Sequence, residues 1–161
     1  DCQMPEMDGF EATRRIRRLP GQMAQAEKNI AEHGFSERIE GHAINLLDHD
    51  KPFPKGADAI WMSQFLDCFP PYDIVKLLEK AKRALTPEGA IYILETYWDR
   101  QKYEASTYSL HATSLYFTCL ANGTSQMYHS NDMYEMIKEA KQEVKDKWDN
   151  IGVSHTLIKC S

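Results

Sequence analysis

The stretch 58-DAIWMSQFLD-67 decides the fold, because it holds a short apolar run that ends in polar residues. The run from Ala57 to Met62 follows the loop 52-PFPKG-56 and has the length of a buried strand. Pro70-Pro71 then opens a helix that we expect from about Tyr72 to Leu85. Its apolar stripe consists of Ile74, Leu77, Leu78, Ala81 and Leu85. After the turn 86-TPEG-89, Ala90 to Leu94 reads as a second buried strand, so the region predicts a parallel βαβ unit.

The segments on either side extend this pattern. Toward the N-terminus we expect a helix from Pro5 to Arg18 after a turn, a helix from Met23 to His33, and a strand from Arg38 to Leu47. Toward the C-terminus we expect a helix over 103–121, a helix that begins at Ser130, and a closing strand from Val153 to Cys160. Alternating strands and helices of this length predict an α/β protein with a mainly parallel sheet.

The C-terminal end of the helix that begins at Ser130 is ambiguous. Met133, Ile137, Ala140, Val144 and Trp148 keep helical spacing, but Val144 and Trp148 would also share one face of a strand. No Gly or Pro interrupts this region, which favours a helix that continues to about Trp148.

Composition limits the classes of function. The 161 residues are 42% hydrophobic and 27% charged, with a net charge of −5, as in a globular protein without the basic surface that nucleic acid requires. No apolar run is long enough for a membrane helix, and we expect a cytoplasmic protein. The four cysteines are scattered without a C-x-x-C pair, so we expect reduced thiols and no metal site.

The N-terminal stretch 1-DCQMPEMDGFEATRRIR-17 resembles the response-regulator receiver family. The resemblance implies that Asp1 corresponds to the residue that accepts a phosphoryl group. That chemistry also needs a Mg²⁺-binding acidic pair, a Thr or Ser, and a Lys, and none of these can be placed in this sequence. We therefore expect Asp1 to have the chemistry of an ordinary terminal residue.

From Leu19 onward the chain is similar to class I S-adenosylmethionine-dependent methyltransferases, in particular the small-molecule O-methyltransferases. The similarity rests on 19-LPGQ-22, 58-DAIWMSQFLD-67, 85-LTPEG-89 and 93-ILE-95, and on the closing 153-VSHTLIKC-160. It implies methyl transfer from S-adenosylmethionine to a small hydroxylated or carboxylated molecule.

The departures from this family are also informative. Neither the Gly-rich loop after the family's first strand nor the acidic residue that binds the cofactor ribose is found ahead of Leu19. We therefore expect a Rossmann-like methyltransferase sheet that lacks its first two strands, preceded by a receiver-like helix, with an incomplete cofactor site. The chain then divides into a receiver-like fragment at 1–18 and a methyltransferase part at 19–161, joined as a hybrid at 19-LPGQ-22. Without the missing strands, we expect the 38–47 strand to be poorly anchored rather than paired with 57–61.

The resemblance assigns site residues by position. Leu47 and Asp48 fall near the adenine-binding position, and Met62, Ser63 and Gln64 fall beside the cofactor sulfur. Asp67 stands where plant-like members carry a catalytic His, and Glu95 where an acid supports that base. An Asp can act as a base when burial raises its pKa.

The aromatic segment 97–129 resembles the family's substrate-covering insertion. Its candidate substrate contacts are Trp98, Tyr108, His111 and Tyr128. Three other assignments remain open from the sequence: a packed helix in this segment, a phosphoacceptor receiver-type fragment, and a non-catalytic fragment that exposes strand edges. The expected partner is a small molecule, with neither nucleic acid nor membrane, and the oligomeric state is left open.

Overall fold

The structure is a computed structural model that describes residues 21–161. The chain divides into two compact units; the first ends at Asn45, and the second runs from Leu46 to Ser161. The predicted helix over residues 5–18 and the predicted phosphoacceptor Asp1 lie outside the described residues.

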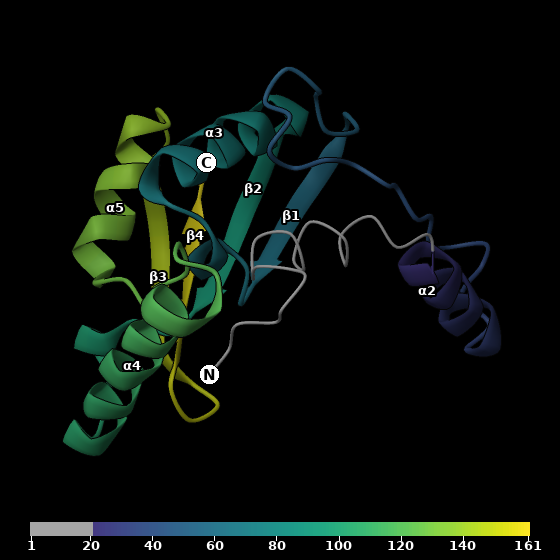
Figure 1. Cartoon of the computed structure of the whole chain (residues 1–161). Coiled ribbons are helices and arrows are strands. Elements are labelled where there is room, and N and C mark those ends of the chain that lie inside the picture. The colour runs from purple at the N-terminus through teal and green to yellow at the C-terminus, as the bar shows by residue number, and fades with distance from the viewer. Residues whose placement is uncertain (1–20) are drawn as a thin grey trace. The chain divides into compact units, whose positions relative to one another are not determined.

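The predicted βαβ unit is confirmed in the second unit. Strand β1 (Ala57–Ser63) leads through the short helix η1 (Leu66–Cys68) into α3 (Pro71–Ala84), which returns the chain to β2 (Leu85–Glu95). Strands β1 and β2 pair in parallel (Figure 1). Pro71 fits the first turn of α3 because that position has no intrahelical N–H partner to lose.

The predicted turn at 86-TPEG-89 is instead an irregular stretch inside β2. Ala57 pairs with Leu85 and Ala59 with Ala90, so the extra residues of β2 bulge out of the ladder. A Cβ at Gly89 would lie 2.9 Å from the Ala57 carbonyl oxygen, which explains the glycine at the bulge.

The closing strand β4 (His155–Cys160) is confirmed and pairs antiparallel with β2. It also pairs with β3 (Val144–Ile151), which gives the sheet order β1-β2-β4-β3. The predicted mainly parallel sheet is therefore wrong: the described sheet is mixed, with one parallel and two antiparallel pairings. Strand β4 lies next to the edge opposite β1, where the antiparallel strand was expected.

The predicted helix through Trp148 is wrong. Helix α5 (Ser130–Glu139) ends at a Schellman-type turn, in which Lys141 takes a φ of +60° and the Gln142 N–H donates to Ile137 O at 3.1 Å. Gln142 is buried, and its Nε2 donates to Leu78 O of α3 at 3.0 Å. This turn fixes the end of the helix and starts β3, although a lysine occupies the position that Gly usually takes.

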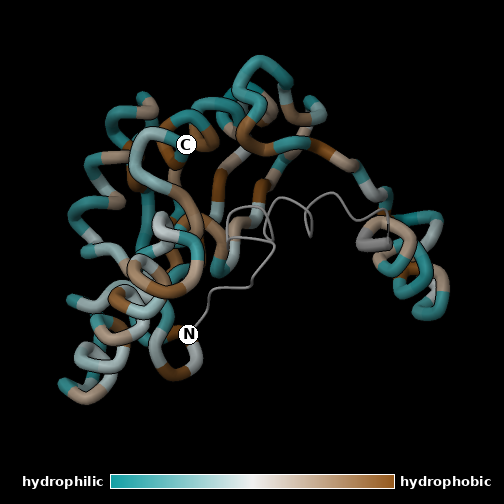
Figure 2. Tube along the Cα trace, in the orientation of Figure 1, coloured by the Kyte–Doolittle hydropathy of each residue, from teal (hydrophilic) through white to brown (hydrophobic). Residues whose placement is uncertain are grey.

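Helices α3 and α5 contact each other and cover one face of the sheet (Figure 1). Apolar residues follow the traces of β1 and β2 (Figure 2). The buried core under the helices includes Met62, Ile74, Leu77, Leu78, Ile91, Ile93, Met133, Ile137 and Ile158. Trp61 in β1 and Trp148 in β3 lie outside this core, and they are 58% and 43% exposed.

The predicted helix over 103–121 is confirmed as two pieces. Helix α4 (Glu104–Tyr116) continues into a π-helical turn, η3 (Phe117–Ala121). A short helix, η2 (Trp98–Arg100), precedes α4. Within residues 21–161, no helix is both long and apolar enough to cross a lipid bilayer.

The first unit contains α2 (Gly21–Glu32), which confirms the predicted helix over 23–33. Gly34 ends it with a φ of +73°. The predicted strand over 38–47 is wrong, since residues 39–45 have no regular secondary structure and Ile39 is 48% exposed. No ladder joins this segment to β1 in the four-stranded sheet, as we expected for a segment without strand neighbours.

Candidate active site

Two carboxylates, Asp67 and Glu95, follow the ends of the parallel strands, and we call them the acid pair. Glu95 is the last residue of β2, and Asp67 lies in η1, just past the end of β1. Glu95 Oε1 accepts hydrogen bonds from the Phe65 and Leu66 N–H groups, both at 2.8 Å. Because β1 and β2 are neighbours in register, these bonds fix η1, and with it Asp67, beside Glu95.

Burial makes both carboxyls unusual. Glu95 is 2% exposed, and burial, together with the negative charge of Asp67, raises its pKa from 4.5 to about 7. Burial also raises the pKa of Asp67, against the hydrogen bonds from Cys68. Glu95 Oε2 has no hydrogen-bond partner among the described residues, so one oxygen of a buried acid is left for a ligand, water or proton.

Asp67 is held from the opposite side by the segment that follows η3. The Gln126 N–H donates to Asp67 O at 3.0 Å, and the Tyr128 hydroxyl donates to Phe69 O at 2.7 Å. Cys68 Sγ lies 3.5 Å from Asp67 Oδ1, and burial, with the charge of Asp67, raises the pKa of this thiol to about 11. Cys68 is therefore a neutral donor to Asp67 and not a thiolate nucleophile.

The predicted cofactor residues at the end of β1 fall into two groups. Met62 is 5% exposed and belongs to the core cluster. Ser63 and Gln64 are exposed. Gln64 takes a φ of +48°, and its N–H donates to Leu94 O at 2.9 Å. A non-glycine residue in this conformation is strained, and such residues are enriched at functional sites.

The other predicted cofactor residues, Leu47 and Asp48, lie in the 46–53 loop that precedes β1. Leu47 is 42% exposed, and Lys51 Nζ lies 3.4 Å from Asp48 Oδ2. His49 Nε2 lies 3.0 Å from Asp73 Oδ1, in the first turn of α3. The loop is thus attached near the start of α3, the end that follows β1 and Asp67.

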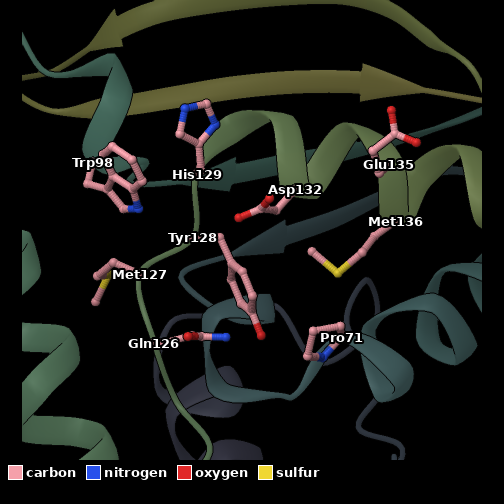
Figure 3. Close-up of a pocket in the computed structure, with 9 residues that line it drawn as sticks. All are labelled: Pro71, Trp98, Gln126, Met127, Tyr128, His129, Asp132, Glu135 and Met136. Carbon is pink, nitrogen blue, oxygen red and sulfur yellow. The ribbon is translucent and has the colours of Figure 1, made fainter.

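A pocket of about 380 Å³ opens beside the segment that holds Asp67. Its lining, drawn in Figure 3, consists of Pro71, Trp98, Gln126, Met127, Tyr128, His129, Asp132, Glu135 and Met136. In that view the Tyr128 side chain lies between Trp98 and Met127 on one side and Pro71 and Met136 on the other. The lining combines aromatic and thioether surface with two carboxylates, and it contains no Lys or Arg.

The predicted substrate contacts are only partly brought together. Trp98 and Tyr128 line the pocket. His111 lies behind Trp98, with a ring-centroid distance of 4.8 Å, whereas Tyr108 is 77% exposed and is not a lining residue. Sequence reasoning missed Met127, His129 and Met136; the start of α5 at Ser130 was the available signal, because it aims the first turn of that helix at the pocket.

Charged residues next to the pocket are paired with one another. Asp99 accepts from the Ser130 N–H at 2.7 Å and from the Ser130 hydroxyl at 2.6 Å. Arg100 Nε donates to Ser130 Oγ at 3.0 Å, and its guanidinium lies within 4.0 Å of Asp99 and Asp149. The cation closest in sequence to Trp98 is therefore already neutralised by two acids.

A family described as an O-methyltransferase domain matches residues 13–143, which is more than half of the 161 residues. The match begins inside the segment that resembles a receiver domain.

Solved structures share the fold. The mitomycin 7-O-methyltransferase gives a TM-score of 0.72 at 16% identity, with 88% of this chain and 39% of that chain covered. The S-adenosylmethionine-dependent methyltransferase SibL, in its apo form, gives 0.68 at 25% identity, with 88% and 41% covered. An O-methyltransferase from neocarzinostatin biosynthesis, solved with S-adenosylmethionine and 2-hydroxy-5-methyl naphthoic acid, gives 0.69 at 17% identity, with 89% and 39% covered. This chain therefore spans about two-fifths of the length of each.

Proposed function

Because this chain belongs to the O-methyltransferase domain family, we propose that it carries the catalytic part of a site that transfers a methyl group from S-adenosylmethionine to a hydroxyl group of a small molecule. The observation that carries the proposal is the acid pair: Glu95, which is buried, and Asp67, which is half-buried, lie together at the ends of the parallel strands, and Gln126, whose N–H binds Asp67 O, lines the aromatic pocket. Ligands of open α/β sheets bind at this end of the strands.

Asp67 is the proposed general base. Its pKa is raised by burial, so its carboxylate is a better proton acceptor than an exposed Asp at neutral pH. In this role it would accept the proton of the acceptor hydroxyl, while the cofactor, when bound, would supply the methyl group and leave as S-adenosylhomocysteine. The reaction is an in-line displacement, so positioning of the hydroxyl supplies much of the catalysis.

Glu95 is the proposed positioning residue for Asp67. Its Oε1 holds the start of η1 through two backbone N–H groups, and its Oε2 is the unpartnered oxygen of the pair. With a pKa of about 7, Glu95 can hold a proton while Asp67 is ionised, which limits the repulsion between two neighbouring carboxylates.

The described residues fit part of a cofactor site. Ser63 and Gln64 are exposed at the end of β1, and Gln64 keeps a strained backbone there, which favours a contact made by these residues. We propose that they and Met62 lie beside the sulfur end of S-adenosylmethionine, and that Leu47 and Asp48 bind its adenine. When bound, this cofactor supplies an electrophilic methyl group.

The pocket favours a hydroxylated acceptor over a carboxylated one. Asp132 and Glu135 line it, no Lys or Arg does, and Arg100 is paired with Asp99 and Asp149. A carboxylate would be repelled here without a compensating cation. Trp98, Tyr128 and the two methionines suit a flat, uncharged or cationic molecule.

The cofactor site of the 161-residue chain is proposed to be incomplete, with the methyltransferase part at 19–161. The sequence contains no Gly-rich loop and no ribose-binding acid ahead of Leu19. Each missing polar anchor is worth about 1–3 kcal/mol, so affinity should fall roughly tenfold to several hundred-fold below that of a complete member.

Calorimetric titration with S-adenosylhomocysteine, the demethylated product, tests the proposal. We expect binding that is weakened or lost in Ser63→Trp, which fills the exposed end of β1, and retained in Ser106→Trp on α4. Incubation with labelled S-adenosylmethionine and a panel of phenols and matched benzoic acids then tests the acceptor class. No binding at millimolar ligand, or label transferred only to the acids, would contradict this function.

The ordinary terminal chemistry expected for Asp1 stays a prediction, because Asp1 lies outside the described residues. Intact-mass analysis after incubation with acetyl phosphate and Mg²⁺ tests it, and we expect no phosphoryl group on Asp1.

A further inference from the structure

A buried lysine on α3 is not used by the proposed chemistry. Lys80 is 1% exposed, on a helix whose other lysines lie at the surface or in surface pairs. Taking an ammonium group out of water costs free energy unless hydrogen bonds replace the lost hydration. Burial accordingly lowers the pKa of Lys80. The groups that bind the Lys80 ammonium must therefore replace its lost hydration.

Lys80 binds the backbone of the 46–53 loop. Its Nζ donates to Asp48 O at 2.9 Å and to Leu46 O at 3.3 Å. The same ammonium lies 4.7 Å from the centre of the Phe53 ring, in a cation–π contact. One side chain therefore contacts three positions of the loop. Among the described residues, no carboxylate lies within ion-pair distance of Lys80 Nζ, so the loop itself supplies its partners.

The two carbonyls that Lys80 binds flank Leu47. Both turn toward α3, which keeps the Leu47 side chain on the outer side of the loop, where it is 42% exposed. The Asp48 carboxylate lies 3.4 Å from Lys51 Nζ. Lys80 thus determines the direction in which Leu47 and Asp48 present their side chains.

A second anchor holds the loop at the start of the same helix. His49 Nε2 lies 3.0 Å from Asp73 Oδ1, and its ring contacts the edge of Tyr72 at 5.9 Å. The anchors are Asp73 in the first turn of α3 and Lys80 about two turns later, so the loop lies along the helix from its first to its third turn.

We infer that Lys80 is a positioning residue that holds the 46–53 loop against α3 in the conformation in which Leu47 and Asp48 bind the adenine end of the cofactor. The inference rests on the proposed function for the identity of the ligand. It goes beyond that function by assigning affinity for the cofactor to a side chain that does not touch it.

The test is Lys80→Met, which keeps the length of the side chain and removes its donors and charge. Lys76→Met is the matched control, because Lys76 lies one turn earlier on α3 and pairs with Glu79 of the same helix. Hydrogen exchange of the 46–53 amides and the Kd of S-adenosylhomocysteine are measured for both variants and the wild-type chain. We expect Lys80→Met to raise the exchange rates of the 46–53 amides and the Kd of S-adenosylhomocysteine about tenfold, while the amides of β2 and β4 stay protected. Lys76→Met should change neither.

A companion variant covers the case in which Lys80→Met does not fold, as judged by circular dichroism. Phe53→Leu leaves α3 intact and removes only the ring under the ammonium, and we expect a rise of about threefold in both measurements.

The outcomes separate the inference from the proposed function. Loop exchange and Kd that stay at wild-type values in a folded Lys80→Met chain would overturn the inference, and so would faster exchange with an unchanged Kd. If the wild-type chain binds no S-adenosylhomocysteine, the proposed function fails, and the exchange data alone decide whether Lys80 holds the loop.

Discussion

The acid pair and the 46–53 loop are held by different groups of the molecule. Asp67 and Glu95 are fixed by backbone groups: Glu95 accepts from two N–H groups of the segment that leads into η1, and Gln126 N–H binds Asp67 O. The loop is fixed by side chains of α3, chiefly Lys80 and Asp73. It has no strand partner.

This difference has a consequence for how each region responds to mutation. The Gln126 N–H bond to Asp67 O joins backbone atoms, so no side-chain truncation removes it directly, whereas the two N–H bonds to Glu95 Oε1 depend on the Glu95 side chain. The loop depends on a few side chains, and each can be removed separately. We expect substitutions at the acid pair to change chemistry and pH dependence, and substitutions around the loop to change cofactor affinity.

The largest expected effect is on catalysis. Asp67→Asn keeps the shape of the side chain and removes the proposed base, so the rate of methyl transfer to an accepted phenol should fall about 100-fold or more. The Kd of S-adenosylhomocysteine should stay within about twofold, because the loop is untouched. Asp146→Asn, on exposed β3, is the control, and equal rates in the two variants would remove Asp67 from the mechanism.

The next effect is on stability as a function of pH. The folded-state pKa of Glu95, about 7, lies above its ordinary value of 4.5, so its contribution is fully present below pH 4.5 and is lost as pH rises through 7. The shift corresponds to about 3 kcal/mol between those limits. Glu95→Gln should therefore flatten the pH dependence of the unfolding free energy between pH 4.5 and 8, measured by urea titration. A wild-type chain that is equally stable at pH 5 and pH 8 would disagree with this prediction.

Tyr128 links the pocket to the segment after η1, and its removal should have a smaller effect. Tyr128→Phe loses the buried 2.7 Å hydrogen bond to Phe69 O, which should lower the unfolding free energy by about 1–2 kcal/mol. Tyr108→Phe, at a residue that is 77% exposed, should change it by less than about 0.5 kcal/mol. Similar losses in both variants would show that the Tyr128 hydroxyl does not support this corner.

The smallest effect is expected at the outer anchor of the loop. His49→Ala removes the contact with Asp73 and should cost about 0.5–1 kcal/mol, with faster exchange of the loop amides. His42→Ala, whose partner Glu40 lies outside the loop, is the control. If His49→Ala speeds loop exchange more than Lys80→Met does, the order of the two anchors is the reverse of the one inferred here.

The sequence predicted the central βαβ unit because 58-DAIWMSQFLD-67 holds the short apolar run of a buried strand and the apolar stripe on α3 has helical spacing. It failed at Val144 and Trp148, since residues four apart fit both a helix and one face of a strand. The deciding interactions are tertiary: Gln142 binds Leu78 O, and after the turn at Lys141 the chain enters β3, which pairs with β4. The expected strand over 38–47 failed for the opposite reason, since its residues have no neighbouring strand within the described sheet.

The candidate site shows the same limit. Asp67 and Glu95 were predicted from the family positions they occupy, and in the structure the register of the parallel strands brings the ends of β1 and β2 together. Lys80 was not, because a lysine on a helix normally reads as a surface residue. A signal was present, since Lys80 lies three residues after Leu77 and four before Ala84, both buried.

The surroundings of Trp98 make the pocket visible to spectroscopy. Its indole packs against His111 at 4.8 Å and His129 at 4.6 Å, whereas the two other tryptophans, Trp61 and Trp148, lie on the exposed side of the sheet. Replacing Trp61 and Trp148 by Phe would leave a single fluorophore between two imidazoles, which quench indole emission when protonated. The emission of that variant would report pocket occupancy directly, so candidate acceptors could be ranked before any of them is known to be methylated.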